Sequence, residues 1–208
     1  MTVSGSARIF ADGCLEAISN WYGASLTITG GTIEGGSLYT ISFQNTSSPG
    51  FVLNQSGGTV LGFIRLDTNS TYNLTGGSVT NTNGSAIQII GVFNQSGGTV
   101  ESYATGGNIE KCAIEIYEGT YTLSGTGKVK QTNPDAYAIA AIKGGTFNFK
   151  GGTITNTGSG VYLDSKSAMY MSGGTMTTPS GKYAVRGVRG CTYQKTGGTI
   201  SGGTVSTN

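Results

Sequence analysis

The 208-residue sequence predicts an all-β solenoid, and three observations lead to this fold class. First, a short motif that ends in Gly-Gly-Thr followed by an apolar residue recurs along the whole chain. Second, helix-favouring residues are scarce, whereas Gly (37), Thr (30) and Ser (22) dominate. Third, the hydrophobic 36% of the chain falls in short, regular clusters, which excludes a disordered chain despite the high glycine content.

The repeat reads φ-x-φ-x-Gly-Gly-Thr-φ, where φ is usually apolar, and it occurs eight times. Its first glycine stands at positions 30, 57, 76, 97, 125, 151, 173 and 197, and the copy at 125 contains a one-residue insertion. The intervals average about 24 residues, which suits one coil of a parallel β-helix with three short strands and three turns. Leucine-rich and helical repeats need Leu-rich or 3.6-residue patterns, and neither is present. Residues 1–208 are therefore predicted to form one solenoid domain of about 8 coils.

Each column of the aligned repeat predicts which side chains face inward. The first and last positions are apolar or aromatic and are expected to stack inside the solenoid on their copies about 4.8 Å away. Between them, Gly-Gly permits a positive φ and a sharp corner. The second position is mostly polar and is expected to face outward. It reads Thr27, Asn54, Asn73, Asn94, Thr122, Asn148, Tyr170 and Gln194. Stacked asparagines form hydrogen-bonded ladders, which is a structural explanation of this column that needs no ligand.

A further strand is predicted in most coils, with small and β-branched residues that fit a narrow interior. Examples are Ala86–Ile89, Ala113–Ile116, Ala138–Ile142, Ala184–Val188 and, in an earlier coil, Cys14–Ile18. The expected central column of these strands is Glu16, Arg65, Gln88, Glu115, Ala140, Asp164 and Arg186. Acidic residues never occupy neighbouring coils in this column, so it contains no carboxylate pair of the kind that glycoside hydrolysis needs.

The chain has no histidine, which removes the commonest general base and the commonest zinc ligand. Cys14, Cys112 and Cys191 lie far apart, form no CxxC motif and are each expected to be buried as small hydrophobic residues. No metal or cofactor is therefore expected. No apolar run reaches 18 residues, so no membrane span is predicted.

Charge is distributed unevenly along the chain. Residues 1–110 contain two basic and six acidic side chains, whereas residues 111–208 contain ten basic and four acidic ones. If the chain progresses along one axis, the molecule has an acidic end and a basic end, and the basic end favours an anionic partner. A solvated surface without a partner explains the same pattern. Dense Arg/Lys runs and a groove-reading helix are both missing, so nucleic acid is not expected as a partner.

The Gly-Gly-Thr-φ motif with φ-x-φ-x ahead of it resembles the right-handed parallel β-helix repeats of secreted or wall-anchored surface proteins of Gram-positive gut bacteria. The resemblance covers about residues 8–205 and implies fold and an extracellular location rather than an activity. Similar repeats occur in adhesins and in carbohydrate-associated surface proteins. Because no capping helix is evident at either end, the chain is expected to be an excerpt of a longer protein or to contact neighbouring repeats end to end.

The favoured function is a non-catalytic surface module that binds a host or environmental glycan or a host secreted protein, such as an immunoglobulin or a mucin. The predicted ligand-binding residues lie near the basic end and are Tyr170, Lys182, Tyr183, Arg186 and Arg189. Tyr170 breaks a polar column that is expected to be exposed, whereas Tyr193 is expected inside. Trp21 and Tyr22 provide aromatic side chains at the other end.

Two alternatives remain open from the sequence. The first is a polysaccharide lyase or glycoside hydrolase domain, for which Glu115 and Glu118, with Glu110 and Lys111 nearby, are the candidate residues. The second is a passive structural spacer whose polar surface binds nothing.

Overall fold

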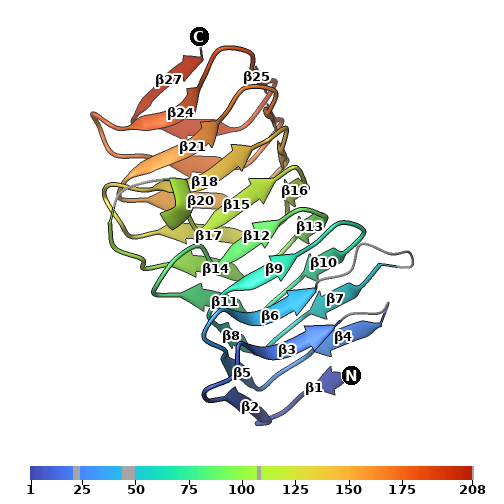
Figure 1. Cartoon of the computed structure of the whole chain (residues 1–208). Coiled ribbons are helices and arrows are strands. Elements are labelled where there is room, and N and C mark those ends of the chain that lie inside the picture. Colours follow the sequence, from blue (N-terminus) through green and yellow to red (C-terminus); the bar gives the residue numbers. More distant parts are fainter. Residues whose placement is uncertain (21–23, 44–49, 107–108, 208) are drawn as a thin grey trace.

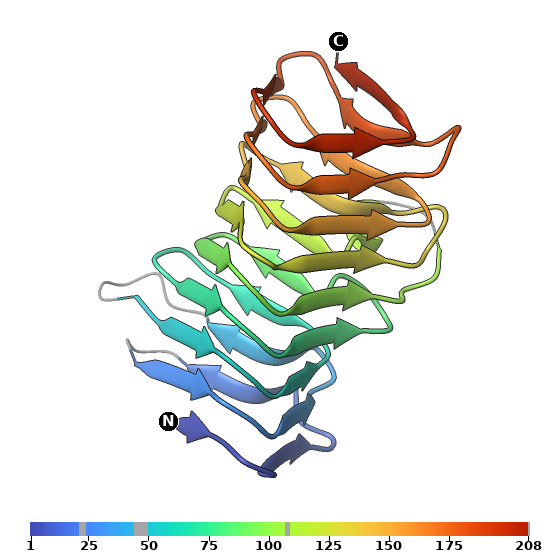
Figure 2. The ribbon, with the colours of Figure 1, turned by 180° about the vertical axis from the view of Figure 1, so that it is seen from behind.

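The computed structural model describes residues 1–20, 24–43, 50–106 and 109–207, and it is a parallel β-solenoid (Figure 1). Three parallel sheets of nine strands each run along the axis and enclose the core. The chain crosses the near side of Figure 1 from left to right and returns across the far side, seen in Figure 2, as it climbs towards its C-terminus. The path is therefore right-handed. The predicted fold class is confirmed.

Each coil contributes one strand to each sheet, in the order first, second, third. The first sheet contains β1 (Thr2–Val3), β4 (Ser25–Ile28), β7 (Val52–Gln55), β10 (Thr71–Leu74), β13 (Val92–Gln95), β16 (Thr120–Leu123), β19 (Thr146–Phe149), β22 (Ala168–Met171) and β25 (Thr192–Lys195). The second contains β2 (Arg8–Ala11), β5 (Thr32–Gly35), β8 (Thr59–Leu61), β11 (Ser78–Asn81), β14 (Thr99–Ser102), β17 (Lys128–Gln131), β20 (Thr153–Asn156), β23 (Thr175–Thr177) and β26 (Thr199–Ser201).

The third sheet completes the coil. It contains β3 (Glu16–Asn20), β6 (Tyr39–Phe43), β9 (Ile64–Leu66), β12 (Ile87–Ile89), β15 (Ile114–Tyr117), β18 (Tyr137–Ile142), β21 (Ser159–Leu163), β24 (Tyr183–Gly187) and β27 (Thr204–Thr207). A 3₁₀ turn, η1 (Ile109–Lys111), lies between β14 and β15. Among the described residues no helix is long and apolar enough to cross a membrane.

The Gly-Gly corner joins the first sheet to the second. Gly77 has a φ of 82°, and a Cβ there would lie 2.5 Å from the carbonyl oxygen of Gly57 in the preceding coil. A side chain is excluded both by the backbone conformation and by the close approach of the neighbouring coil. This explains why the motif keeps two glycines at the corner.

The inward columns form the core as the repeat predicts. The rings of Tyr72, Phe93, Tyr121 and Phe147 are fully buried and stack along the axis. Their centroids are 4.7, 4.9 and 5.1 Å apart. Tyr193, in the same column, is half-buried and packs against the core. Burial of these large rings supplies much of the hydrophobic stabilisation between coils.

Two buried glutamines in this core were not predicted. Gln55 accepts a hydrogen bond of 2.5 Å from the Tyr72 hydroxyl, and Gln95 accepts one of 2.6 Å from the Tyr121 hydroxyl. The amide nitrogen of Gln95 donates to the carbonyl oxygens of Gly98 and Lys128. Each tyrosine hydroxyl therefore has a polar partner inside the solenoid, which offsets the cost of burying it.

The outward asparagine column forms the expected ladder. Asn73 Nδ2 donates to Asn54 Oδ1 at 2.9 Å, and Asn94 Nδ2 donates to Asn73 Oδ1 at 3.1 Å. Stacking in register brings the three amides together because the Cα atoms of these residues pair directly between β7, β10 and β13. The predicted ladder is confirmed for Asn54, Asn73 and Asn94.

The structure corrects two predictions on the third sheet. Arg65, Gln88, Glu115, Ala140 and Arg186 share a column, but Tyr162 occupies the place expected for Asp164. Ser19, not Glu16, continues that column through Ser42. The reason is the variable length of the turns that precede this sheet, where no motif recurs from coil to coil to fix the register.

The second correction concerns the cysteines. Cys112 is buried and Cys191 is partly buried, but Cys14 is exposed. Cys14 precedes β3 and lies in the turn from the second sheet to the third, where its carbonyl oxygen accepts a hydrogen bond from the Ser37 backbone nitrogen. The strand was predicted to begin too early. Burial raises the pKa of the Cys112 thiol to about 12.

Candidate functional site

Three tyrosines and one arginine form a cluster on the outer face of the third sheet, which we call the tyrosine–arginine surface. It consists of Tyr137 on β18, Tyr162 on β21, and Tyr183 and Arg186 on β24. The guanidinium carbon of Arg186 lies 5.3 Å from the centroid of the Tyr183 ring. The Arg186 Nη1 donates to the Tyr137 hydroxyl at 3.5 Å. The rings of Tyr137 and Tyr162 are tilted against each other with centroids 5.4 Å apart.

Strand register brings these side chains together. Arg186 pairs with Tyr162 on the neighbouring strand, so both side chains point outward from the same column. Tyr137 pairs with Ser159 on β21, and the backbone nitrogen of Tyr183 donates to the Ser159 hydroxyl at 3.3 Å. The small serine thus lies between two tyrosines from strands two coils apart.

The cluster is accessible and positively charged. Tyr183 is 37% exposed and Arg186 is exposed, whereas Tyr137 and Tyr162 are half-buried. The hydrogen bond with Tyr137 raises the pKa of Arg186 above its ordinary value. A guanidinium held on rigid strands among aromatic rings combines a fixed charge with flat stacking surfaces.

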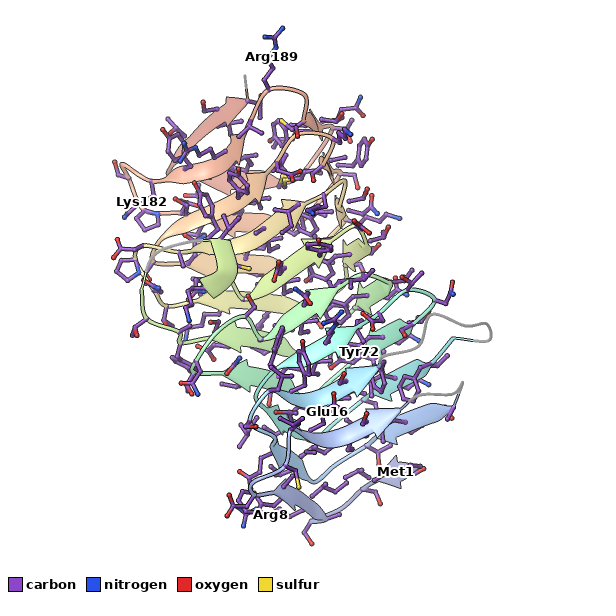
Figure 3. All side chains as sticks on the ribbon, viewed as in Figure 1. Met1, Arg8, Glu16, Tyr72, Lys182 and Arg189 are labelled. Carbon is purple, nitrogen blue, oxygen red and sulfur yellow. The ribbon has the colours of Figure 1, made fainter. Side chains whose placement is uncertain are left out.

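The predicted site residues lie in different places. Tyr183 and Arg186 are brought together, whereas the Nζ of the adjacent Lys182 lies 3.8 Å from Asp135 Oδ1. Arg189 lies in the turn after β24 and projects from the C-terminal end of the molecule, far from Lys182 in Figure 3. Tyr170 is 41% exposed but lies on β22 of the first sheet, a different face of the solenoid. Trp21 and Tyr22 lie outside the described residues.

Tyr137 and Tyr162 are members of the cluster that the sequence prediction missed. A signal for one of them exists, because Tyr137-Ala-Ile and Tyr183-Ala-Val are the same Tyr-Ala-φ tripeptide in two coils. No comparable signal marks Tyr162, since its place depends on the register of the third sheet.

Two of the acidic residues proposed for an enzyme lie in the described part of the chain, Glu115 on β15 and Glu118 after it. Glu115 accepts a hydrogen bond from Gln88 Nε2 at 3.1 Å, and Glu118 lies in the following turn with a φ of 66°. The Glu110 side chain lies outside the described part of the chain. Within that described part, no group of three or more His, Cys, Asp or Glu residues is arranged to hold a metal ion.

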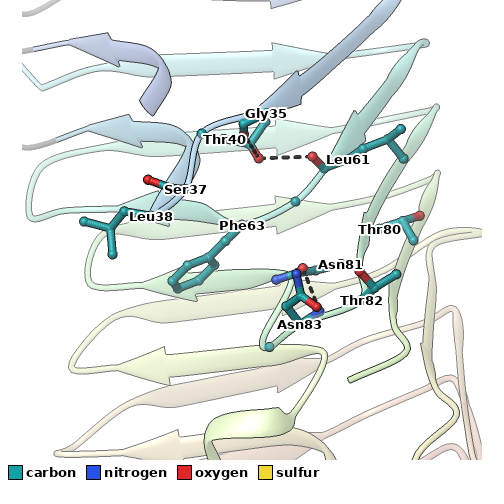
Figure 4. Close-up of a pocket in the computed structure, with 13 residues that line it drawn as sticks. Gly35, Ser37, Leu38, Thr40, Leu61, Phe63, Thr80, Asn81, Thr82 and Asn83 are labelled. Atoms are coloured by element: carbon teal, nitrogen blue, oxygen red, sulfur yellow. Dashed lines mark hydrogen bonds between the residues drawn. The ribbon is translucent and has the colours of Figure 1, made fainter. Parts of the chain in front are cut away.

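A second feature is a groove of about 550 Å³ at the edge between the second and third sheets (Figure 4). Its lining consists of thirteen residues, Gly35, Gly36, Ser37, Leu38, Thr40, Leu61, Gly62, Phe63, Thr80, Asn81, Thr82, Asn83 and Gly84. This volume lies in the range of about 300–1,000 Å³ that is typical of small-molecule sites.

The groove exists because one coil is short. Only Gly62 and Phe63 connect β8 to β9, whereas longer turns, residues 36–38 and 82–86, project from the coils on either side. The Gly62 nitrogen donates to the Thr80 carbonyl oxygen, and a Cβ on Gly62 would lie 2.0 Å from the Thr40 hydroxyl. The Thr40 hydroxyl itself lies within hydrogen-bonding distance of the Gly35 and Leu61 carbonyl oxygens. The floor of the groove is therefore a tightly fixed turn.

The three parallel sheets define the class of this protein as a parallel β-solenoid with two distinct surface features, one cationic and aromatic, the other a neutral groove. Comparisons with protein-family models, with curated proteins and with solved structures gave no match.

Proposed function

We propose that this protein is a non-catalytic binding module of a secreted or wall-anchored bacterial surface protein, and that its tyrosine–arginine surface binds an acidic glycan. The observation that carries the proposal is Arg186, exposed, stacked on Tyr183 and hydrogen-bonded to Tyr137. Sialylated and sulfated chains combine an anionic group with flat, partly apolar sugar rings. The surface offers a partner for both parts.

Charge on the rest of the chain supports an anionic ligand. Residues 111–208 contain ten basic and four acidic side chains, and the tyrosine–arginine surface belongs to that half. Lys182 is paired with Asp135, and Lys143, which follows β18, lies over the ring of Tyr117 at 5.2 Å. A local excess of positive charge accelerates the approach of an anionic partner and makes binding sensitive to salt.

The proposed extracellular location rests on the repeat. The Gly-Gly-Thr-φ motif resembles repeats of surface proteins from Gram-positive gut bacteria, and a stiff rod of stacked coils is suited to displaying a site away from the cell. A host glycan, carried for example by a mucin, is the partner that we propose for such a location.

The test is binding of sialylated and sulfated oligosaccharides compared with their neutral parent chains, measured on the intact protein at low and high NaCl concentration. We expect the acidic chains to bind more tightly, and we expect NaCl to weaken that binding. Tyr183→Ala and Arg186→Ala should each reduce affinity about tenfold or more, the size of effect typical of a central aromatic or arginine contact. Lys150→Ala is the matched control, because it removes an exposed positive charge from the turn that follows β19, away from the third sheet.

Equal affinity for acidic and neutral chains, or full affinity in Arg186→Ala, would contradict the proposal. Binding of an acidic protein such as an immunoglobulin, with no binding of any acidic oligosaccharide, would replace the glycan by a protein partner. If Arg186→Ala then lost that protein binding, the proposed site would be supported and the proposed glycan ligand would be contradicted.

A further inference from the structure

The groove at the edge of the second and third sheets differs in chemistry from the tyrosine–arginine surface. None of the thirteen described residues that line it carries a formal charge. Its exposed polar side chains are hydroxyls and an amide, from Ser37, Thr82 and Asn83. These groups donate and accept hydrogen bonds without favouring either sign of charge.

Apolar surface lies beside these polar groups. Leu38 is 53% exposed and Leu61 is 39% exposed, while the half-buried ring of Phe63 packs against Tyr39 with centroids 5.2 Å apart. An exposed apolar surface next to hydroxyl and amide groups matches a ligand that is itself apolar on one face and rich in hydroxyls at its edge.

Among the described residues, hydrogen bonds of Asn81 and of the Asn83 backbone fix the wall of the groove at 82–86. Asn81 Nδ2 donates to the Ser85 carbonyl oxygen at 2.7 Å, and Asn81 Oδ1 accepts from the Asn83 backbone nitrogen at 3.1 Å. Lys111 Nζ donates to the Asn83 carbonyl oxygen at 2.9 Å. The turn is thus shaped by Asn81 and by the backbone of Asn83, and a rigid wall binds a ligand at a lower entropic cost than a loop that must order.

The spacing of the walls sets the thickness of the ligand. The turns at 36–38 and 82–86 belong to coils that flank the short one, so their backbones are separated by two coil spacings, roughly 9–10 Å. The missing middle layer is about 4.8 Å thick, which is the space of one flat ring between two layers.

We propose that this groove is a second binding site, independent of the tyrosine–arginine surface, and that it takes a sugar ring of a neutral oligosaccharide. The ring enters edge-on between the two projecting turns, with its edge towards Phe63 and Leu61, one apolar face towards Leu38, and its hydroxyls towards Thr82, Asn83 and Ser37. Because the lining is uncharged, binding at this site is insensitive to salt.

The probe is a panel of neutral tetrasaccharides built from glucose, galactose, mannose and N-acetylhexosamines, titrated into the intact protein at low and high NaCl concentration. We expect at least one member to bind with an affinity that NaCl does not change. Thr82→Trp, which fills the groove, should weaken that affinity more than tenfold. Asn83→Ala should weaken it about fivefold, the effect of one lost hydrogen bond. Thr155→Trp is the matched control, since Thr155 is an exposed threonine on the second sheet outside the groove.

The two variants keep the proposal testable even if one is unstable. Thr82→Trp requires a folding check by circular dichroism, whereas Asn83→Ala keeps the backbone groups that hold the turn. The inference is overturned if no neutral chain binds, or if a neutral chain binds equally well to wild type, Thr82→Trp and Asn83→Ala. Loss of neutral binding in Arg186→Ala with no loss in Asn83→Ala also overturns it. None of these results depends on whether acidic chains bind, so failure here is distinct from failure of the proposed function.

Discussion

Two of the coils with a two-residue connection between the second and third sheets have different surroundings. Gly62 and Phe63 connect β8 to β9, and Thr157 and Gly158 connect β20 to β21. Above the first connection lies the groove of about 550 Å³. At the second connection, the turn at 132–136 of the preceding coil packs onto the backbone, so that a Cβ on Gly158 would lie 2.3 Å from the Ala136 carbonyl oxygen.

The difference lies in how the neighbouring turns are fixed. The turn at 132–136 is pulled inward by the buried Asn133, whose backbone nitrogen donates to Gln131 Oε1 and whose Oδ1 accepts from the Asp135 nitrogen. The turn at 82–86 projects outward and is fixed by hydrogen bonds from Asn81 and Lys111. A short coil therefore creates a hollow only where its neighbours do not fold over it. One region offers an open neutral groove and the other a filled edge next to a cationic surface.

The core behind the two connections differs as well. Tyr72, in the coil that follows the first connection, is fully buried and bonded to Gln55 of the short coil, and Tyr121, in the coil that carries the turn at 132–136, is bonded in the same way to Gln95. The coil of the second connection contains instead the fully buried Phe147 and Phe149, and Phe147 pairs with Met169 of the next coil. Burial raises the pKa of Tyr72 and of Tyr121 well above the ordinary value. The pKa of Cys112 is likewise raised to about 12.

Alkaline pH should therefore cause the largest loss in the free energy of unfolding. A folded-state pKa above the unfolded one gives stability that is full below the unfolded pKa and is lost as pH rises towards the folded pKa. The loss should begin above about pH 8.5 for Cys112 and above about pH 10 for the tyrosines, at about 1.4 kcal/mol per group per pH unit. Urea unfolding at a series of pH values measures it.

The double variant Tyr72→Phe, Tyr121→Phe should lose less free energy of unfolding per pH unit above about pH 10 than the wild type does. Proteolysis with an alkaline-active protease should cut the central coils before those that contain Phe147 and Met169. An unchanged slope in the double variant, or first cleavage in the C-terminal coils, would reject this difference between the two cores.

The Gly-Gly-Thr repeat was enough to predict the fold and to predict which side chains of the first two sheets point inward and which point outward. Tyr72 lies inside and Asn73 outside because the glycine pair fixes the position of every residue around it. The third sheet was less predictable, since the turns before it vary in length and Tyr162 entered the column expected for Asp164. The tyrosine–arginine surface was thus predicted in part. The groove was not, because it depends on what neighbouring turns do around a short one.

Glycine substitutions in the two connections should have smaller effects on stability, and for different reasons. Gly158→Ala places a Cβ against the backbone of the neighbouring turn, and it should lower the free energy of unfolding by about 1–3 kcal/mol. Gly62→Ala should be destabilising for a different reason, since its Cβ would meet the Thr40 hydroxyl and its φ is 130°. The free energy of unfolding in urea measures both.

Thr40→Ala should partly restore stability to Gly62→Ala, because it removes the oxygen that the new Cβ would contact. Gly158→Ala has no comparable rescue, because its contact is a carbonyl oxygen of the main chain. Gly84→Ala is the control, since a Cβ there would meet nothing closer than 3.9 Å. Additive effects of Gly62→Ala and Thr40→Ala would show that the hydroxyl does not set the floor of the groove.

The smallest expected effect concerns the ion pair across the second connection. Lys182 and Asp135 are 38% and 70% exposed at a separation of 3.8 Å, and exposed pairs contribute between about 0 and 1 kcal/mol. Lys182→Ala and Asp135→Ala, alone and together, should therefore give a coupling energy below about 1 kcal/mol in a double-mutant cycle of urea unfolding. Neither variant should gain affinity for neutral tetrasaccharides, because the main chain of residues 132–136, rather than the ion pair, fills this edge. A gain of such binding in Lys182→Ala would mean that the salt bridge alone distinguishes the filled edge from the open groove.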